Sequence, residues 1–464
     1  MHNPRVKRWV GPTVIVAFAC SLLLLWYPRS HKLLEDDTDT AVLLSRLVEP
    51  HSPFKWFTGD WPLQNHFYRP ISSLTYELDV RLFGVNATQL FFTSTVICIF
   101  CIFALFWLAA EMGLKPYAAA AAASLFAFWH MPLDLPWHAI GSGVAALILL
   151  AGFARHRLRA GLYLPAGLAV AFFASELYGP FHREAPTGFY TSIEAWLPGR
   201  TPAVMCLFAV LAMASYLRYE KLRTDPVFEE PLSTDLPATR MSTQASANTA
   251  KAWPFGLLSV LAFMLALGSY EQAAMLPLVL VLLAICVRGT GRRPHWQLHG
   301  AFFVLLLGYF VLWLSVLPLD TSGYQDRALR IGPGVLVTLG EYVFPALADL
   351  PSWLAIFAVG GTVLLTPALY AWPLSFLGNI VAYKEGLLKH KLALLTWMAS
   401  AVAIAPMAFL KPFAHYHYWP SALRSIFVVA LFGAVAKLAV SAVSLPTVQA
   451  PRRPSPAPGS LPHR

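Results

Sequence analysis

Four carboxylates crowd the start of the chain, directly after its first apolar stretch: Glu35, Asp36, Asp37 and Asp39. Like charges at this spacing repel, so we expect the pKa of at least one carboxyl to rise, or a divalent cation to be recruited. A carboxylate with a raised pKa suits a general base that takes the proton of an attacking hydroxyl. The same residues also fit the solvated first turn of a helix, which the helix dipole favours. The residues alone leave both interpretations open.

Further polar side chains in the loops are candidates for substrate binding. Arg69 lies in the same acidic and aromatic loop, and Arg200 lies at the outer end of an apolar stretch. Either guanidinium is able to grip a phosphate in bidentate fashion, and either is equally able to snorkel at the interface. Glu271 lies between two apolar stretches, where an unpartnered carboxylate costs about 2.5–3.5 kcal/mol, so we expect it to be partnered or functional. The complete candidate set for substrate binding is His66, Tyr68, Arg69, Arg200, Glu271, His415 and His417.

The sequence assigns no metal site and no certain cofactor. His66, His415 and His417 are able to join a divalent metal with Asp36 or Asp37, but no ligand spacing such as HxxxH supports this, so a metal stays only an open option. The five cysteines all lie in apolar stretches and form neither a disulfide framework nor a zinc motif. They are Cys20, Cys98, Cys101, Cys206 and Cys286. Cys98 and Cys101 have CxxC spacing in the middle of a stretch, where we expect core packing.

The elements that carry these residues are predicted to be membrane-spanning helices. The chain has 464 residues, 57% of them hydrophobic and 12% charged, whereas soluble domains carry about 25% charge. A span needs roughly 20 apolar residues. About twelve stretches of this kind lie near residues 9–27, 88–111, 116–130, 138–154, 161–177, 201–217, 253–269, 273–288, 299–318, 353–373, 392–410 and 421–442. We therefore expect an all-α, polytopic transmembrane helical bundle.

Charge distribution predicts how the bundle is oriented. The net charge is +10, but the cationic residues collect on alternate loops, as the positive-inside rule requires, which argues against a nucleic-acid partner. This pattern places both termini in the cytoplasm and the first loop, residues 28–87, on the outer face. We expect an integral, multi-pass protein of the bacterial inner (plasma) membrane.

Two amphipathic segments in the first external loop are predicted to be interfacial helices. Asp37 or Thr38 is able to cap the first, whose apolar stripe includes Leu44, Leu47 and Val48. The second segment runs from Ile71 to Phe83 and carries Leu74, Leu78 and Leu82 on one face.

The loops divide the chain into four parts. Residues 1–217 form an N-terminal transmembrane half, and residues 253–443 form a C-terminal half. Residues 218–252 are rich in Ser, Thr, Pro and Ala, which predicts a flexible cytoplasmic linker. Residues 444–464 form a Pro-rich tail that we expect to be disordered.

Five segments, in order along the chain, carry a family resemblance. They are the pair Asp36-Asp37, the stretch YRPISSLTYELDVRLFG, the GR of WLPGRTPAVMCLFAV, SYEQAAMLPLVLVLL and YWPSALRSIFVVAL. The set resembles the GT-C superfamily of membrane glycosyltransferases, and is most similar to the protein O-mannosyltransferase-like branch that includes the tetratricopeptide membrane O-mannosyltransferases. This chain departs from that branch because no tetratricopeptide repeats follow the last apolar stretch, which leaves its acceptor open.

The resemblance implies a function and a set of partners. In such enzymes an Asp of the first external loop is the general base, which maps here to Asp36 or Asp37. The reaction would be an inverting hexosyl or mannosyl transfer from a polyprenyl-phosphate donor to a hydroxyl of a protein or glycan acceptor, in contact with membrane lipids. The alternatives are a polytopic transporter or lipid flippase, or a non-catalytic lipid-binding family member. A transporter needs ionisable residues near the membrane midplane, whereas the carboxylates here gather at the outer ends of the stretches.

Overall fold

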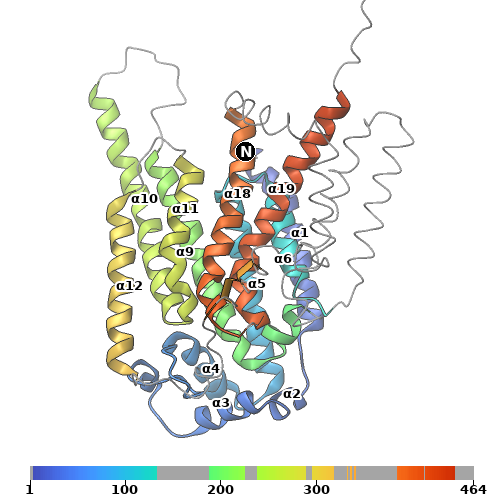
Figure 1. Ribbon diagram of the computed structural model, residues 1–464, viewed down its shortest axis with the longest axis vertical. Helices are drawn as coiled ribbons and strands as arrows, with labels where there is room; N and C mark the ends of the chain where they lie inside the picture. Colours follow the sequence, from blue (N-terminus) through green and yellow to red (C-terminus); the bar gives the residue numbers. More distant parts are fainter. Residues whose placement is uncertain are drawn as a thin grey trace, which may run out of the picture.

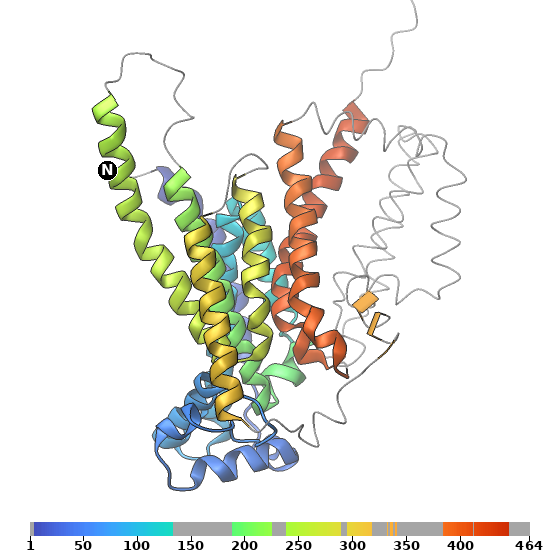
Figure 2. The same ribbon diagram turned by 60° about the vertical axis from the view of Figure 1, so that its left-hand side comes forward.

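The computed structural model describes residues 4–132, 188–224, 238–288, 295–317, 384–411 and 413–444, with five further residues between 332 and 340. The secondary structure in these ranges is helical, without a β-sheet. Nine α-helices run roughly along the long axis of the molecule (Figures 1 and 2). They are α1 (Pro4–Trp26), α5 (Ala87–Glu111), α6 (Pro116–Phe128), α9 (Arg200–Thr224), α10 (Ala238–Leu267), α11 (Leu276–Arg288), α12 (Trp296–Val316), α18 (Lys384–Ile404) and α19 (Tyr418–Ser444).

Six segments of the described chain are long and apolar enough to cross a membrane. They are Arg8–Trp26, Ala87–Glu111, Leu197–Arg223, Ala250–Leu267, Trp296–Val316 and Leu392–Phe409. α12 leaves large apolar side chains such as Val304, Leu307 and Val311 exposed. A helix with an uncovered apolar surface of this kind is suited to contact lipid. The chain is therefore an integral, multi-pass membrane protein.

The long helices coincide with nine of the twelve apolar stretches predicted from the sequence. The other three, 138–154, 161–177 and 353–373, lie outside the described residues, as does the tail beyond Ser444. Residues 218–252 were predicted to form a flexible linker, but much of this segment is helical. α9 continues to Thr224, and α10 already begins at Ala238. Residues 225–237 lie outside the described part of the chain.

α9 lies at the centre of the bundle, packed against α5, α10, α11 and α19. Small residues allow close packing elsewhere. α6 buries Ala119, Ala120, Ala122 and Ala123, and it contacts α1, α5 and α19. Small side chains let membrane helices approach closely, so that van der Waals contact replaces the hydrophobic effect as the packing force. One apolar core extends over both the N-terminal and the C-terminal helices.

The first loop folds as a small layer at one end of the bundle (Figure 1). It contains α2 (Lys32–Glu35), α3 (Thr38–Val48), the 3₁₀ turn η1 (Pro53–Phe57) and α4 (Pro70–Phe83). This layer has its own apolar core, to which Leu43, Trp56 and Leu197 contribute. The N-terminus, the start of α10 and the end of α19 lie at the opposite end of the molecule (Figures 1 and 2).

The sequence predicted that the apolar stripe of α3 faces the membrane interface, and the structure corrects this prediction. Leu44 and Leu47 are buried in the core of the layer, and only Val48 is exposed. An amphipathic helix has the same sequence pattern whether it packs on lipid or on protein. Here α3 packs on α4 and on the 3₁₀ turn η3 (Leu197–Gly199), which is distant in the chain.

α4 is inverted relative to a helix of a soluble protein. It buries the polar residues Ser72, Tyr76 and Asp79, while Leu78 and Leu82 are 58% and 62% exposed. Exposed leucines opposite a buried polar face are suited to a helix that lies at the membrane interface, as the sequence predicts for this segment.

Candidate functional site

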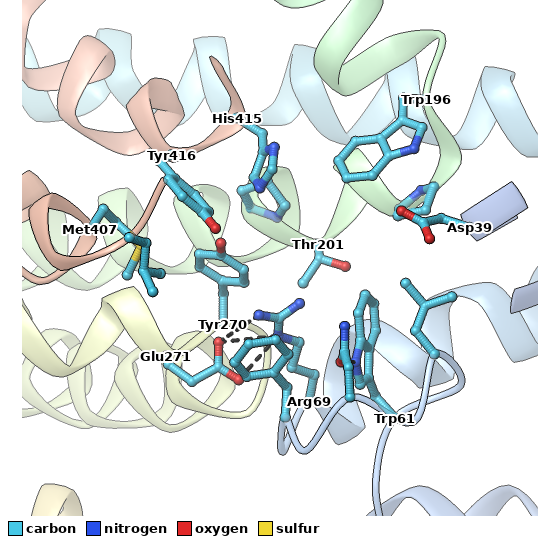
Figure 3. Close-up of a pocket in the computed structure, with 16 residues that line it drawn as sticks. Asp39, Trp61, Arg69, Trp196, Thr201, Tyr270, Glu271, Met407, His415 and Tyr416 are labelled. Atoms are coloured by element: carbon cyan, nitrogen blue, oxygen red, sulfur yellow. Dashed lines mark hydrogen bonds and ion pairs between the residues drawn. The ribbon is translucent and has the colours of Figure 1, made fainter. Parts of the chain in front are cut away.

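A pocket of about 140 Å³ lies where the first loop meets the end of the bundle (Figure 3). Side chains from five segments of the chain line it. They are Asp39; Trp61, Leu63, Asn65, Phe67 and Arg69; Trp196, Pro198, Thr201 and Pro202; Tyr270 and Glu271; and Met407, Leu410, His415 and Tyr416. Acidic, cationic, aromatic and apolar side chains all face the same space. A small, mainly apolar cavity with a few convergent polar groups is the usual form of a ligand site.

Arg69 is the cation of the pocket. Its Nε lies 3.1 Å from both carboxylate oxygens of Glu271, and its Nη2 lies 2.8 Å from Oε2. The rings of Trp61, Phe67 and Tyr270 surround the guanidinium, with centroids 4.5, 4.2 and 4.3 Å from Cζ. Burial alone would lower the pKa of Arg69, but Glu271 more than offsets this and holds the pKa above its ordinary value. Nη1 has no hydrogen-bond partner among the described residues.

Backbone contacts fix where Arg69 and Glu271 meet. Arg69 precedes α4, whose first residue is Pro70, a residue pre-organised for the first helical position. The N–H of Ile71 donates to the carbonyl of Gly268 at 2.8 Å, and the Ser72 hydroxyl donates to Ser269 at 3.0 Å. These bonds tie the start of α4 to the turn after α10, so the pairing of Arg69 with Glu271 follows from the backbone.

The loop that carries Trp61 and Phe67 is folded around the carboxylate of Asp60. This group accepts hydrogen bonds from the N–H groups of Trp61, His66 and Phe67 at 2.8, 2.7 and 3.0 Å. Burial raises the pKa of Asp60 despite these bonds, which favour the ionised form. His66 has a φ of 63° in this tight loop. The hydrogen bonds to Asp60 therefore position Trp61 and Phe67, two of the three rings that surround Arg69.

Asp39 is the carboxylate that lines the pocket near Trp196 (Figure 3). It lies in the first turn of α3, and it makes no hydrogen bond or ion pair within the described part of the chain. Asp39 is exposed to solvent, yet partial desolvation and the neighbouring charge of Asp37 raise its pKa above the ordinary value. A carboxylate without a protein partner is free to accept a proton from a ligand.

Asp36 and Asp37, the candidates taken from the sequence, occupy different surroundings. Asp36 ends α2 and is exposed outside the pocket lining. Asp37 is the N-cap of α3, where it accepts hydrogen bonds from the N–H and hydroxyl of Thr40 at 2.8 and 2.6 Å. The indole N–H of Trp196 also donates to Asp37, at 3.0 Å. Asp37 therefore caps the helix and positions a pocket wall.

His415 and Tyr416 form the wall opposite the first loop. The His415 ring stacks on Phe413 and lies 5.1 Å from Trp196, centroid to centroid. Burial and the charge of Arg69 lower the pKa of His415 to about 3, so the imidazole is neutral near pH 7. The amide of Gln272 donates to the carbonyls of Ala403 and Tyr416 at 2.8 and 3.1 Å, which ties this wall to the segment that carries Glu271.

Arg200 lies outside the pocket lining and is fully buried. Its Nη1 pairs with Asp79 at 2.7 Å, and its other donors bind Ser94 and the carbonyls of Thr75 and Leu90. A guanidinium with this many protein partners joins α4, α5 and α9 and offers no donor to a ligand. The structure therefore does not support the predicted phosphate contact of Arg200. Arg200 begins α9, as the sequence suggested, but the first loop covers its side chain.

The remaining predicted binding residues surround the pocket without lining it. Tyr68 is buried and donates to the carbonyl of Phe57 at 3.2 Å. His66 belongs to the Asp60 turn, and His417 is 2% exposed at the start of α19. Of the predicted binding residues, the structure brings Arg69, Glu271 and His415 together.

Several lining residues were missed from sequence, namely Asp39, Trp61, Trp196, Tyr270 and Tyr416. The position of Asp39 three residues after Asp36 was visible as part of the acidic cluster. The aromatic residues carry no spacing signal of their own, because their proximity arises from long-range packing.

Comparison of the chain with protein-family models, with curated proteins and with solved structures gave no match.

Proposed function

We propose that the chain is a membrane glycosyltransferase that moves a sugar from a polyprenyl-phosphate donor to an acceptor hydroxyl on the extracytoplasmic face. The observation that supports it best is the pocket itself. There the carboxylate of Asp39, which has no partner among the described residues, and the guanidinium of Arg69 face one space among aromatic rings. The proposal includes a GT-C-like bundle of about twelve spans, of the kind that the sequence predicts.

Each step of the transfer has a candidate group. Asp39 takes the proton of the acceptor hydroxyl as its oxygen attacks the anomeric carbon of the sugar. The bond from that carbon to the phosphate oxygen breaks, and the lipid phosphate leaves with the electron pair. Arg69 stabilises the charge of the departing phosphate through Nη1, the donor that its pairing with Glu271 does not use.

The walls suit the rest of such a donor. Trp61, Trp196 and Tyr416 offer ring faces to a pyranose, and Leu63 and Leu410 offer apolar surface to the first isoprene unit. Neutral His415 is able to donate or accept a hydrogen bond with a sugar hydroxyl.

The test is sugar transfer in membranes that contain the full chain, with polyprenyl-phosphate mannose and then polyprenyl-phosphate glucose as donor. Asp39→Asn should lower the rate by about 10²-fold or more, because that is the usual contribution of a general base. Asp36→Asn is the matched control, since Asp36 belongs to the same acidic cluster but lies outside the pocket lining, and it should retain full activity.

Full activity of Asp39→Asn would remove the assignment of the base. Absence of transfer by the wild-type chain, together with ion-driven uptake of a solute in proteoliposomes, would instead support the transporter alternative. Lipid binding that persists without turnover would identify a non-catalytic family member.

A further inference from the structure

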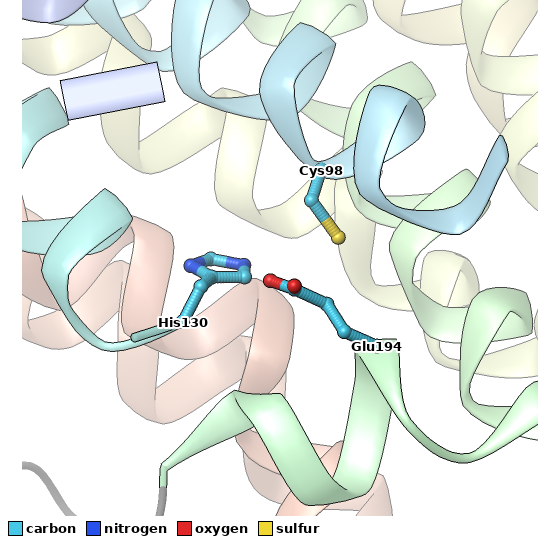
Figure 4. Close-up of side chains that lie close together, drawn as sticks. All are labelled: Cys98, His130 and Glu194. Atoms are coloured by element: carbon cyan, nitrogen blue, oxygen red, sulfur yellow. The ribbon is translucent and has the colours of Figure 1, made fainter. Parts of the chain in front are cut away.

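A second group of polar side chains lies in the helical core, away from the pocket lining. The thiol of Cys98 on α5, the imidazole of His130 just after α6 and the carboxylate of Glu194 converge (Figure 4). Glu194 ends η2 (Tyr190–Glu194), a short helical turn that η3 (Leu197–Gly199) separates from α9. One ligand atom from each residue lies within 4.8 Å of the other two, and all three residues are buried.

Both ring nitrogens of His130 have hydrogen-bond partners, and these partners fix its tautomer. Its Nδ1 lies 2.8 Å from the carbonyl of Phe126, a group that only accepts, so Nδ1 carries the proton. This leaves the lone pair on Nε2, which lies 2.8 Å from the Tyr418 hydroxyl. Donation from the other ring nitrogen to a carbonyl is the usual way in which a protein fixes the tautomer of a metal-binding histidine.

Glu194 provides the independent indication of a missing partner. The residue is 1% exposed, and its Oε1 has no hydrogen-bond partner among the described residues. The aromatic rings of Phe126, Phe189 and Tyr418 pack around His130, so the surroundings are apolar. A buried polar oxygen without a partner in such surroundings is destabilising.

We propose that Cys98, His130 and Glu194 bind one zinc ion. A thiolate and a carboxylate together carry two negative charges, so a divalent cation makes the site neutral, which an apolar core favours. Zinc–ligand distances of about 2.0–2.3 Å require ligand atoms somewhat closer together than the 4.8 Å limit that holds here, so the side chains must move inward by about an ångström. The Tyr418 hydroxyl then leaves Nε2, and this oxygen or a water takes the fourth position.

The site is a structural one, since it is buried and distinct from the pocket. Zinc would join α5, the end of α6 and η2. Glu194 is two residues from Trp196, and Tyr418 is two residues from Tyr416, so the bound ion would brace two walls of the pocket.

Cobalt titration of the full chain in detergent tests the proposal, because a cobalt–thiolate bond gives a near-ultraviolet charge-transfer band. The wild-type chain should bind one equivalent with this band, and Cys98→Ser should lose it. Cys101→Ser is the matched control on the same helix, because Cys101 is equally buried and its thiol donates to the Ala203 carbonyl at 3.2 Å. This variant should keep the band, while Glu194→Gln should weaken cobalt binding by about 10-fold or more.

Zinc-edge X-ray absorption of the wild-type chain is a second test, and it does not depend on whether any variant folds. One sulfur among the zinc neighbours supports the site, and an environment of nitrogen and oxygen alone overturns it. Persistence of the cobalt band in Cys98→Ser, or no stoichiometric binding of zinc or cobalt by the wild-type chain, also overturns it. None of these readouts depends on sugar transfer, so failure here leaves the proposed function standing.

Discussion

Asp37 and Asp39 are two positions apart and differ in what their carboxylates contact. Asp37 receives hydrogen bonds from Thr40 and Trp196, whereas Asp39 receives none within the described residues. The first carboxylate is therefore occupied by the protein, and the second is available to a ligand. The two remain coupled, because the charge of Asp37 adds to partial burial in raising the pKa of Asp39.

This coupling predicts a change in the pH profile of sugar transfer. A base acts only when ionised, so activity should be present above the pKa of Asp39 and lost as pH falls through it. The acidic limb should lie above pH 3.8, since the pKa of Asp39 is raised. Asp37→Asn removes the neighbouring charge and should shift this limb to lower pH, while asparagine preserves the N-cap of α3.

The measurement is kcat/KM against pH for the wild-type chain, Asp37→Asn and Asp36→Asn. An unchanged limb in Asp37→Asn would contradict the assignment of Asp39 as the titrating base.

The sequence located the acidic cluster but did not identify which of its carboxylates faces the pocket. That choice depends on where α3 begins and on Trp196, which lies 159 positions from Asp37 and binds it. Arg69 and Glu271 were both singled out, each for its own chemistry, yet their pairing over 202 positions comes from packing. Arg200 has the same residue type as Arg69, and only the structure distinguishes a covered guanidinium from one that faces a cavity.

At the scale of elements, the contact between α4 and the bundle determines the shape of the pocket. Arg200 joins α4 to α5 and α9 through Asp79, Thr75 and Ser94. Tyr76 of α4 also donates to the carbonyl of Leu197 at 3.1 Å. The polar face of α4 is therefore held by specific bonds, while Leu78 and Leu82 remain exposed.

Arg200→Gln should destabilise the protein by about 3–5 kcal/mol, because it leaves the buried carboxylate of Asp79 without its cation. Adding Asp79→Asn should recover part of this loss, since the uncompensated charge is then removed. Arg46→Gln is the control, because Arg46 pairs with Glu49 at 3.5 Å on an exposed surface, where pairs contribute about 0–1 kcal/mol.

Thermal unfolding in detergent checks this ordering. A melting temperature of Arg200→Gln as high as that of Arg46→Gln would show that the Arg200 network does not hold α4 to the bundle.

A second prediction at the scale of elements concerns Gly199, where η2 packs closely against the start of α9. A Cβ at this position would lie 2.2 Å from the carbonyl oxygen of Ser192 and 2.9 Å from Cα of Ile193. Both are backbone atoms, so Gly199→Ala must push η2 away from the start of α9. We expect a lower melting temperature and a weaker cobalt–thiolate band, because the shift of η2 displaces the proposed ligand Glu194.

Gly308→Ala is the control for this variant, because nothing lies within 4 Å of a Cβ built there in α12. It should leave both measurements unchanged or raise the melting temperature slightly, since alanine favours a helix interior. A wild-type melting temperature in Gly199→Ala would mean that η2 and α9 are not in close contact.

The spans were predicted from the length of the apolar stretches in the sequence, and the long helices of the described chain lie at those positions. The mismatches occur where polar composition suggested a loop. Residues 218–224 and 238–252 are helical, although Ser, Thr and Ala dominate the second of these stretches. The apolar stripe of α3 was identified correctly, but protein rather than lipid covers it. The periodicity of a sequence does not show which distant segments will pack on a helix, so this cover was not predicted.

At the scale of the whole molecule, the first loop and the N-terminus lie at opposite ends of the bundle (Figure 1). The positive-inside pattern predicts that the end with the first loop faces outward. Asp36→Cys places a thiol on an exposed part of this loop. A membrane-impermeant maleimide should label it in intact cells.

The wild-type chain is the first control for this labelling, because it gives the background from its five native cysteines, of which Cys20, Cys98, Cys101 and Cys206 are buried. Lys115→Cys is the second control, since Lys115 lies in the basic connection between α5 and α6, and it should be labelled only after the cells are opened. The reverse result would place the loop on the cytoplasmic face and remove the proposed extracytoplasmic reaction.

The pocket draws its walls from positions 39 to 416 of the chain, which has a consequence for biosynthesis. A nascent polypeptide inserted as far as residue 404 already contains Asp39, Arg69 and Glu271 but lacks His415 and Tyr416. The site therefore comes into being only near the end of translation. Under the proposed function, incomplete products released by stalled ribosomes should leave the polyprenyl-phosphate donors of the cell untouched.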